Sequence, residues 1–173
     1  MHKWLFSVPV WKIVRVGKLI IINNRSCSGC GLGTYSINEP ATNCTPCDPG
    51  KYNPETLQMS CLTCPAGKYS NSGSMACTNC TAGNFSLQGS GSCTQCPAGQ
   101  FASSAGQSSC TKCPAGQNSE IESSTCSNCS AGYYSNEGSG NCTKCPVGFY
   151  SDSSAAPKCS TCPTYYSSSE GST

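Results

Sequence analysis

Cysteine is the residue of this chain whose type and spacing could do chemistry. All 18 cysteines of the 173-residue sequence lie in Cys-x-x-Cys pairs that recur every 16 or 17 residues. Cysteines paired in this way can bind zinc, exchange electrons between dithiol and disulfide, or form structural cross-links. The nine pairs begin at Cys27, Cys44, Cys61, Cys77, Cys93, Cys110, Cys126, Cys142 and Cys159.

The regular spacing indicates one small unit copied end to end, and therefore a stack of repeats rather than a globule. In eight of the nine repeats a glycine lies three residues after the second cysteine of the pair. In five repeats a proline directly follows that cysteine. Pro-x-Gly predicts a tight turn in which the glycine has positive φ. The glycines are Gly33, Gly50, Gly67, Gly83, Gly99, Gly116, Gly132 and Gly148.

An aromatic residue lies five positions after the second cysteine in seven repeats, at Tyr35, Tyr52, Tyr69, Phe85, Phe101, Tyr134 and Tyr150. We expect each repeat to form two very short strands joined by a polar bend, with the rings in single file as a minimal core. An exposed aromatic ladder that binds sugar or peptide is the alternative. Asn118 replaces the ring in one repeat and predicts a weak layer. The last repeat has Tyr165 and Tyr166 and lacks the glycine, so a different turn is expected there.

Apolar burial is too small to hold such repeats together. A 16-residue unit offers about one aromatic and few aliphatic side chains, which does not offset the entropy of ordering its backbone. Covalent cross-links and contacts between neighbouring repeats must supply the difference. The predicted fold class is therefore a small disulfide-rich repeat, an elongated solenoid-like rod of short β-hairpins with little or no helix.

Sequence alone does not determine how the cysteines pair. A disulfide within one pair closes a four-residue ring typical of redox sites. A disulfide from the second cysteine of one pair to the first of the next joins the ends of the expected hairpin, and each such loop contributes about 3 kcal/mol. This favoured scheme leaves Cys27 and Cys162 without partners. It predicts Cys30–Cys44, Cys47–Cys61, Cys64–Cys77, Cys80–Cys93, Cys96–Cys110, Cys113–Cys126, Cys129–Cys142 and Cys145–Cys159.

Zinc is the serious alternative, because two Cys-x-x-Cys pairs separated by about 15–20 residues are typical of zinc sites. Nine pairs cannot be combined into four-cysteine sites without one left over, and the only histidine is His2. A thioredoxin-like role is less favoured still, because no βαβ pattern surrounds any pair. We therefore predict neither a metal nor another cofactor.

The disulfide scheme predicts an oxidising compartment, and so a secreted or cell-surface location. Asn-x-Ser/Thr sequons, the acceptors of N-linked glycans, agree with it. A chain rich in Asn, Ser and Thr also generates such triplets by chance, and several have cysteine as the middle residue. The candidate glycosylation sites are Asn24, Asn43, Asn79, Asn84, Asn128 and Asn141.

Residues 1–26 form a basic and apolar segment unlike the repeats at 27–173, of which we expect the last to be incomplete. Trp4 to Trp11 resembles the apolar part of a secretion signal, but Lys12 interrupts it and no small-residue cleavage site follows. The run Leu19 to Ile22 favours a strand that docks on the first repeat or on another chain. A third possibility is that Met1 is not the start of the mature protein. No stretch is long and apolar enough to span a membrane.

The run Cys61-Leu-Thr-Cys-Pro-Ala-Gly-Lys-Tyr-Ser70 resembles the ephrin-receptor-like cysteine-rich repeat, one of the growth-factor-receptor and tumour-necrosis-factor-receptor-like modules. The resemblance covers residues 27–173, and similar arrays are common in large surface proteins of single-celled eukaryotes. It implies an extracellular disulfide-bonded rod that serves as stalk, coat, fibre or adhesive surface, and it implies no particular ligand.

The function that the sequence favours is an extracellular structural or adhesive rod whose partners are other protein chains, through self-association or neighbouring surface proteins. A receptor-type module that recognises a protein or glycan is the alternative. An enzyme is not predicted, because no nucleophile has an activating partner. The repeats carry five lysines against eight acids and no basic stripe, which argues against nucleic acid. The chain ends where the next cysteine is due, so we expect a longer array; pairing of the terminal thiols across chains is the alternative.

Overall fold

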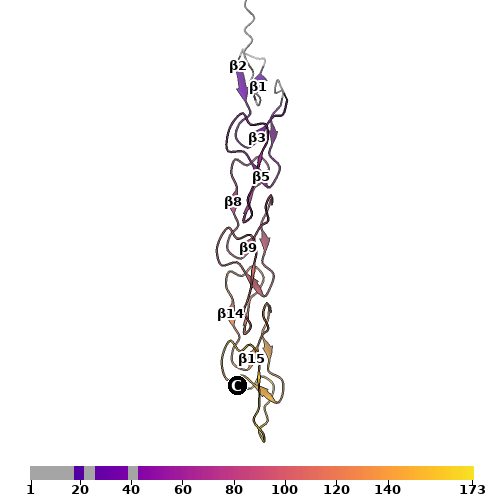
Figure 1. Ribbon diagram of the computed structural model, residues 1–173, viewed down its shortest axis with the longest axis vertical. Helices are drawn as coiled ribbons and strands as arrows, with labels where there is room; N and C mark the ends of the chain where they lie inside the picture. Colours follow the sequence, from indigo (N-terminus) through magenta and orange to yellow (C-terminus); the bar gives the residue numbers. More distant parts are fainter. Residues whose placement is uncertain (1–17, 22–25, 39–42) are drawn as a thin grey trace, which may run out of the picture.

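The computed structural model describes residues 18–21, 26–38 and 43–173, with side chains from residue 29 on, and these residues form an elongated rod (Figure 1). Within these ranges the secondary structure is β-strand and turn, without a helix. The strands of these residues pair only in twos, so the described part of the chain has no sheet wide enough to enclose a shared core. The predicted fold class is confirmed.

Strand β1 (Lys18–Ile21) pairs antiparallel with β2 (Ser26–Gly29), with Lys18 opposite Gly29. Part of the N-terminal segment is thus a strand at the first cysteine pair. The apolar run from Trp4 to Trp11 and the sequon at Asn24 lie outside the described residues.

Eight further hairpins follow, each made of two strands of two residues. Their strands are β3 (Thr34–Tyr35), β4 (Thr45–Pro46), β5 (Lys51–Tyr52), β6 (Leu62–Thr63), β7 (Lys68–Tyr69), β8 (Thr78–Asn79), β9 (Asn84–Phe85), β10 (Thr94–Gln95), β11 (Gln100–Phe101), β12 (Thr111–Lys112), β13 (Gln117–Asn118), β14 (Ser127–Asn128), β15 (Tyr133–Tyr134), β16 (Thr143–Lys144), β17 (Phe149–Tyr150) and β18 (Ser160–Thr161).

In each of these eight hairpins the second strand is the pair of residues between the two cysteines. Tyr69 lies opposite Thr78, and Lys68 lies opposite Asn79. The N–H of Cys80 then donates to the carbonyl of Gly67 at 2.9 Å and extends the ladder by one bond. The two residues inside each of these Cys-x-x-Cys pairs are therefore hairpin strands.

The turn before each hairpin is the one predicted from Pro-x-Gly. The N–H of Lys68 bonds the carbonyl of Pro65 at 3.2 Å, and Gly67 has a φ of +84°. The other seven turn glycines also have positive φ. In the last repeat the expectation of a different turn was wrong. Tyr165 takes the glycine position with a φ of +74°, and Tyr166 N–H still bonds Pro163.

The core is a column of sulfur and small polar groups. The second cysteine is 0–1% exposed in all eight disulfide-bonded pairs, and the serine that follows the aromatic residue is also buried, as at Ser70 and Ser86. The aromatic rings are only half-buried. The buried interior thus consists of groups close to the backbone, and the rings lie at its edge, whereas the sequence had suggested the rings as the core.

Hairpins recur around the rod in a regular order. In Figure 1, β3, β9 and β15 appear at the same place across the rod, and β8 and β14 share another place. Each of these strands is three hairpins from the next of its set. Successive hairpins therefore face different directions, and every third one returns to the same direction.

Candidate functional site: the interface between stacked repeats

Eight disulfides cross-link the described residues, each from the second cysteine of one pair to the first cysteine of the next. They join Cys30–Cys44, Cys47–Cys61, Cys64–Cys77, Cys80–Cys93, Cys96–Cys110, Cys113–Cys126, Cys129–Cys142 and Cys145–Cys159. This is the scheme that the sequence favoured. Cys162 has a free, half-buried thiol, and the side chain of Cys27 lies outside the described part.

Each disulfide closes one bend, and backbone hydrogen bonds then join one repeat to the next. We name each repeat by its second cysteine. The N–H of the turn glycine donates to a carbonyl of the following repeat, as from Gly67 to Ser86 at 2.8 Å. Seven turn glycines make this bond, at 2.8–2.9 Å. In the Cys145 repeat, Gly148 N–H instead donates to the hydroxyl of Ser168 at 3.0 Å.

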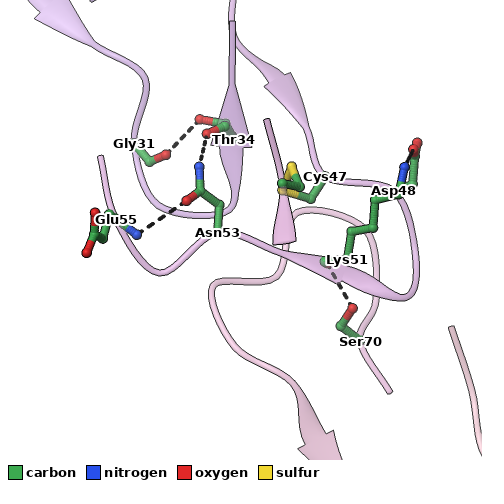
Figure 2. The surroundings of a disulfide bond; sticks show 9 residues. Gly31, Thr34, Cys47, Asp48, Lys51, Asn53, Glu55 and Ser70 are labelled. Atoms are coloured by element: carbon green, nitrogen blue, oxygen red, sulfur yellow. Dashed lines mark hydrogen bonds and ion pairs between the residues drawn. A yellow bond between two sulfur atoms is a disulfide. The ribbon is translucent and has the colours of Figure 1, made fainter. Parts of the chain in front are cut away.

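A second set of bonds runs between repeats from side chains. The hydroxyl of Ser70 donates to the carbonyl of Lys51 at 2.9 Å, and the amide of Asn53 donates to the carbonyl of Thr34 at 2.7 Å, beside the Cys47 disulfide (Figure 2). Equivalent bonds start from Ser86, Ser119, Ser135 and Ser168. All of these donors except the half-buried Ser168 are buried and partnered, so the small polar residue after the ring belongs to the interior.

Two repeats interrupt this side-chain series. Ala102 occupies the serine position, is fully buried and carries no hydroxyl to donate. Ser151 donates to the carbonyl of Ser153 in its own repeat at 3.0 Å, and not to the preceding repeat. The signal in the sequence for this interior position is the recurrence of a small residue, most often serine, directly after the aromatic residue.

The bend of each repeat is fastened to the cysteine of the repeat before it. The N–H of Gly106 donates to the carbonyl of Cys80 at 2.8 Å, and all eight disulfide-bonded second cysteines receive such a bond at 2.8–3.0 Å. The donor, which we call the bend residue, always has positive φ. Five bend residues are glycines. The other three are Leu57, Glu122 and Ala155.

The bend also reaches back two repeats. A Cβ placed on Gly67 would collide with the backbone carbonyl of Gly106, which lies in the second repeat after it. The same collision occurs at every turn glycine from Gly33 to Gly132, but nothing lies within 4 Å of a Cβ placed on Gly148. The turn glycine is therefore required twice, by its φ and by the absence of room, in seven of eight turns.

Glu122 adds a side-chain contact over the same distance. Its carboxylate accepts hydrogen bonds from the amides of Asn84 at 2.9 Å and Gln95 at 2.6 Å. Asn84 and Gln95 belong to the Cys80 repeat, two repeats before Glu122. The stack is thus interleaved, because each repeat contacts both the next repeat and the one after it.

The half-buried rings lie beside the disulfide of the following repeat. Tyr35 and Cys61 line one surface hollow, and Tyr69 and Cys93 line another. In the repeat without a ring, Asn118 Oδ1 lies 3.4 Å from Cys142 Sγ, and its Nδ2 donates to a carbonyl at 3.3 Å. The β13–β14 hairpin keeps the common register. Whether this layer is weaker stays a prediction.

The sequons occupy two kinds of environment. Asn43, Asn79, Asn128 and Asn141 are exposed. Asn84 is 7% exposed, and its Nδ2 donates both to Glu122 and to Thr81 Oγ1 at 3.2 Å. Both protons of that amide are therefore engaged in the folded repeat.

Other chemistry finds little support among the residues that the structure describes. No group of three or more His, Cys, Asp or Glu side chains there is placed to hold a metal ion. Sulfur atoms bonded in disulfides are not thiolate ligands, so the sixteen bonded cysteines are not placed as zinc ligands in this arrangement. The ion pair found in these ranges, Lys51 with Asp48 at 3.2 Å, is exposed and contributes little. A helix able to cross a membrane is likewise absent from the described ranges.

Comparison with known proteins gives one family. The family model described as "Tyrosine-protein kinase ephrin type A/B receptor-like" matches residues 33–68, 83–129, 116–158 and 132–173. Together these segments cover most of the disulfide-bonded rod. No curated protein matches the chain significantly.

Proposed function

The chain belongs to the ephrin type A/B receptor-like family, and on this basis we propose that it serves as an extracellular rod, a stalk or coat component that holds other groups at a set distance. Its cysteine-rich repeats are consistent with an extracellular module. We propose that its role is mechanical and not catalytic, and that its partners are protein chains, including further copies of itself.

The interleaved contacts are the observation that carries this proposal. A stack in which repeats touch only their immediate neighbours can bend at every junction. Here the bend at Gly106 bonds Cys80 in the preceding repeat and also lies against Gly67 one repeat further back. To open one junction, the chain must therefore break contacts across two. This geometry favours a stiff spacer.

The disulfides support the proposed location outside the cell. Sixteen of the cysteines are bonded in pairs, and such bonds persist in oxidising compartments and are rare in the cytosol. Each closes a loop with a sequence separation of 13 or 14 and contributes about 3 kcal/mol in the chain-entropy estimate.

The rod function is tested by its length. Small-angle X-ray scattering would compare the secreted chain with deletions of two repeats (residues 96–128) and three repeats (residues 96–144). Both deletions rejoin Gln95 to a second cysteine and keep every remaining pair intact. At about 10 Å for each packed layer, the maximum dimension should fall by about 20 and 30 Å. A maximum dimension that does not fall with the number of repeats contradicts the proposal.

A receptor-type binding role is the second candidate, and one surface favours it. Tyr35, Ile37 and Met59 line a hollow of about 170 Å³, with Ile37 69% and Met59 49% exposed. Exposed apolar side chains gathered at one site are typical of protein contacts. Replacing Ile37 and Met59 with serine should abolish binding to an extracellular protein ligand and leave the rod's length unchanged. A double variant that binds such a ligand as the native chain does contradicts this role.

A further inference from the structure

The repeats follow a longer period of three. From Cys47 on, the sequence separations of the disulfides run 14, 13, 13, 14, 13, 13, 14. Three repeats therefore span 49 residues, the distance from Cys80 to Cys129. Other features return at the same interval, including Pro65, Pro114 and Pro163 after the second cysteine.

This longer period matches the arrangement of hairpins around the rod. Strands three hairpins apart, such as β8 and β14, share one place across it in Figure 1. Residues 49 positions apart therefore face the same direction. The rod has three sides, and each side is made of every third hairpin.

The exposed sequons fall on two of these sides. Asn79 ends β8 and Asn128 ends β14, and the two are 49 positions apart. Asn43 lies two residues before β4 and Asn141 lies two residues before β16, and the two are twice that distance apart. Thr81 and Ser130 complete the first two triplets at the place where other repeats have proline.

The third side has no sequon. It consists of the hairpins β5–β6, β11–β12 and β17–β18, at the cysteine pairs that begin at Cys61, Cys110 and Cys159. We name it the bare side. The distribution of acceptor triplets thus follows the three-repeat period and is not spread evenly over the repeats.

The side-chain environments agree with this division. Asn43, Asn79, Asn128 and Asn141 are exposed. The side-chain amide of Gln117 donates to Oδ1 of Asn128, which leaves Nδ2 of Asn128 free. A bulky glycan on any of the four would extend into solvent. At Asn84 a glycan would displace the hydrogen bonds to Glu122 and Thr81, and with them a contact between repeats.

We propose that N-linked glycans occupy Asn43, Asn79, Asn128 and Asn141, so that two sides of the rod carry sugar and the bare side carries none. In the transfer, Asn Nδ2 forms a bond to the sugar C1 of a lipid diphosphate donor. The bond from C1 to the diphosphate oxygen breaks, and the proton lost by Nδ2 leaves with the released diphosphate. This proposal rests on the extracellular location proposed above.

Transfer must precede disulfide closure. In all four triplets the middle residue is a cysteine that is bonded in the folded rod, Cys44, Cys80, Cys129 or Cys142. A sequon held by a disulfide beside its neighbours cannot extend freely into an enzyme. Mild reductant in the secreting cells should therefore raise the occupancy of these sites.

The experiment is site-by-site mass spectrometry of the full chain secreted from a eukaryotic cell. N-glycosidase treatment in heavy-oxygen water converts each occupied asparagine to labelled aspartate. We expect label at all four exposed sites and none at Asn84, because a chain that carries a glycan at Asn84 loses the contact with Glu122 and does not fold into the secreted rod. Absence of label from Asn79 or Asn128, or label at Asn84 in the folded product, overturns the proposal.

Ser92→Asn serves as a control that should gain a glycan. Ser92 lies one 49-residue period after Asn43 and one before Asn141, and it precedes Cys93 and Thr94, so the substitution creates a sequon on the same side of the rod. This variant should gain one glycan, and failure to gain it also counts against the proposal.

Thiol titration of the same sample separates failure of the glycan proposal from failure of the extracellular-rod proposal. Protein whose cysteines are bonded but whose sites are unlabelled leaves the extracellular rod intact and removes the glycan proposal. Protein with mostly free thiols contradicts both.

Discussion

The Cys64 repeat and the Cys145 repeat contain the same turn but place it under different constraints. Gly67 and Gly148 both have a φ of +84°. Gly67 faces the backbone carbonyl of Gly106, whereas nothing lies within 4 Å of a Cβ on Gly148. The first glycine is needed for both its conformation and its lack of a side chain, and the second only for its conformation. The comparison separates what one repeat requires from what the stack requires.

Gly67→Ala against Gly148→Ala is the direct test of this difference, and it has the largest expected effect. Both substitutions force alanine into a left-handed conformation at a cost of about 1–2 kcal/mol. At Gly67 the collision also displaces the Gly106 bend, so the total cost should reach about 4 kcal/mol. Hydrogen exchange of the amides in each variant measures the two losses. Equal losses would show that the two-repeat contact contributes nothing.

Breaking one disulfide should have the next largest effect. Cys96→Ser opens the Cys96–Cys110 loop and should cost about 3 kcal/mol locally, because the unfolded loop regains its freedom. Cys162→Ser is the matched control, because Cys162 is not bonded and its loss should cost little. Limited proteolysis with mass spectrometry locates the opened region. Cooperative unfolding of the entire rod in Cys96→Ser would argue against local stability in a stack.

Substitutions in the series of buried hydroxyls should have a smaller effect on stability, with opposite signs for removing and for adding a hydroxyl. Ser86→Ala leaves the carbonyl of Lys68 without its 3.0 Å partner and should cost about 1 kcal/mol. Ala102→Ser should restore the missing bond in the Cys96 repeat and stabilise it by less, because that site is fully buried and the oxygen must find room. Denaturation midpoints measure both. Two shifts of the same sign would contradict the assigned role of the hydroxyl.

Substitutions at the bend residues should have the smallest effects on stability, and these effects should have opposite signs in two repeats. Ala155 has a φ of +59°, so Ala155→Gly should stabilise the Cys145 repeat by about 0.5–1 kcal/mol. Gly138→Ala should destabilise its repeat by a similar amount, because a Cβ there meets only the Lys112 side chain at 3.4 Å. Thermal midpoints of the two single variants check the pair. A midpoint that falls in Ala155→Gly counts against the conformational argument.

The features predicted from the sequence are those confined to one repeat. Gly67 after Pro65 indicated the turn, and the even spacing of cysteines favoured disulfides between successive pairs. The buried Ser86 and the bend carbonyl against Gly67 were missed, because both depend on how far one layer is displaced from the next. The 49-residue period was present in the loop lengths all along. The loop lengths do not show which direction a hairpin faces, and it is the position of β8 and β14 in the rod that relates the period to its sides.

The cysteine connectivity is the most direct test of this account. Digestion of the secreted protein without reduction, followed by mass spectrometry, should recover peptides that join the second cysteine of one pair to the first of the next, from Cys30–Cys44 to Cys145–Cys159. Disulfides within single Cys-x-x-Cys pairs, or cysteines held by metal ions, would contradict the stacked rod and the functions proposed from it.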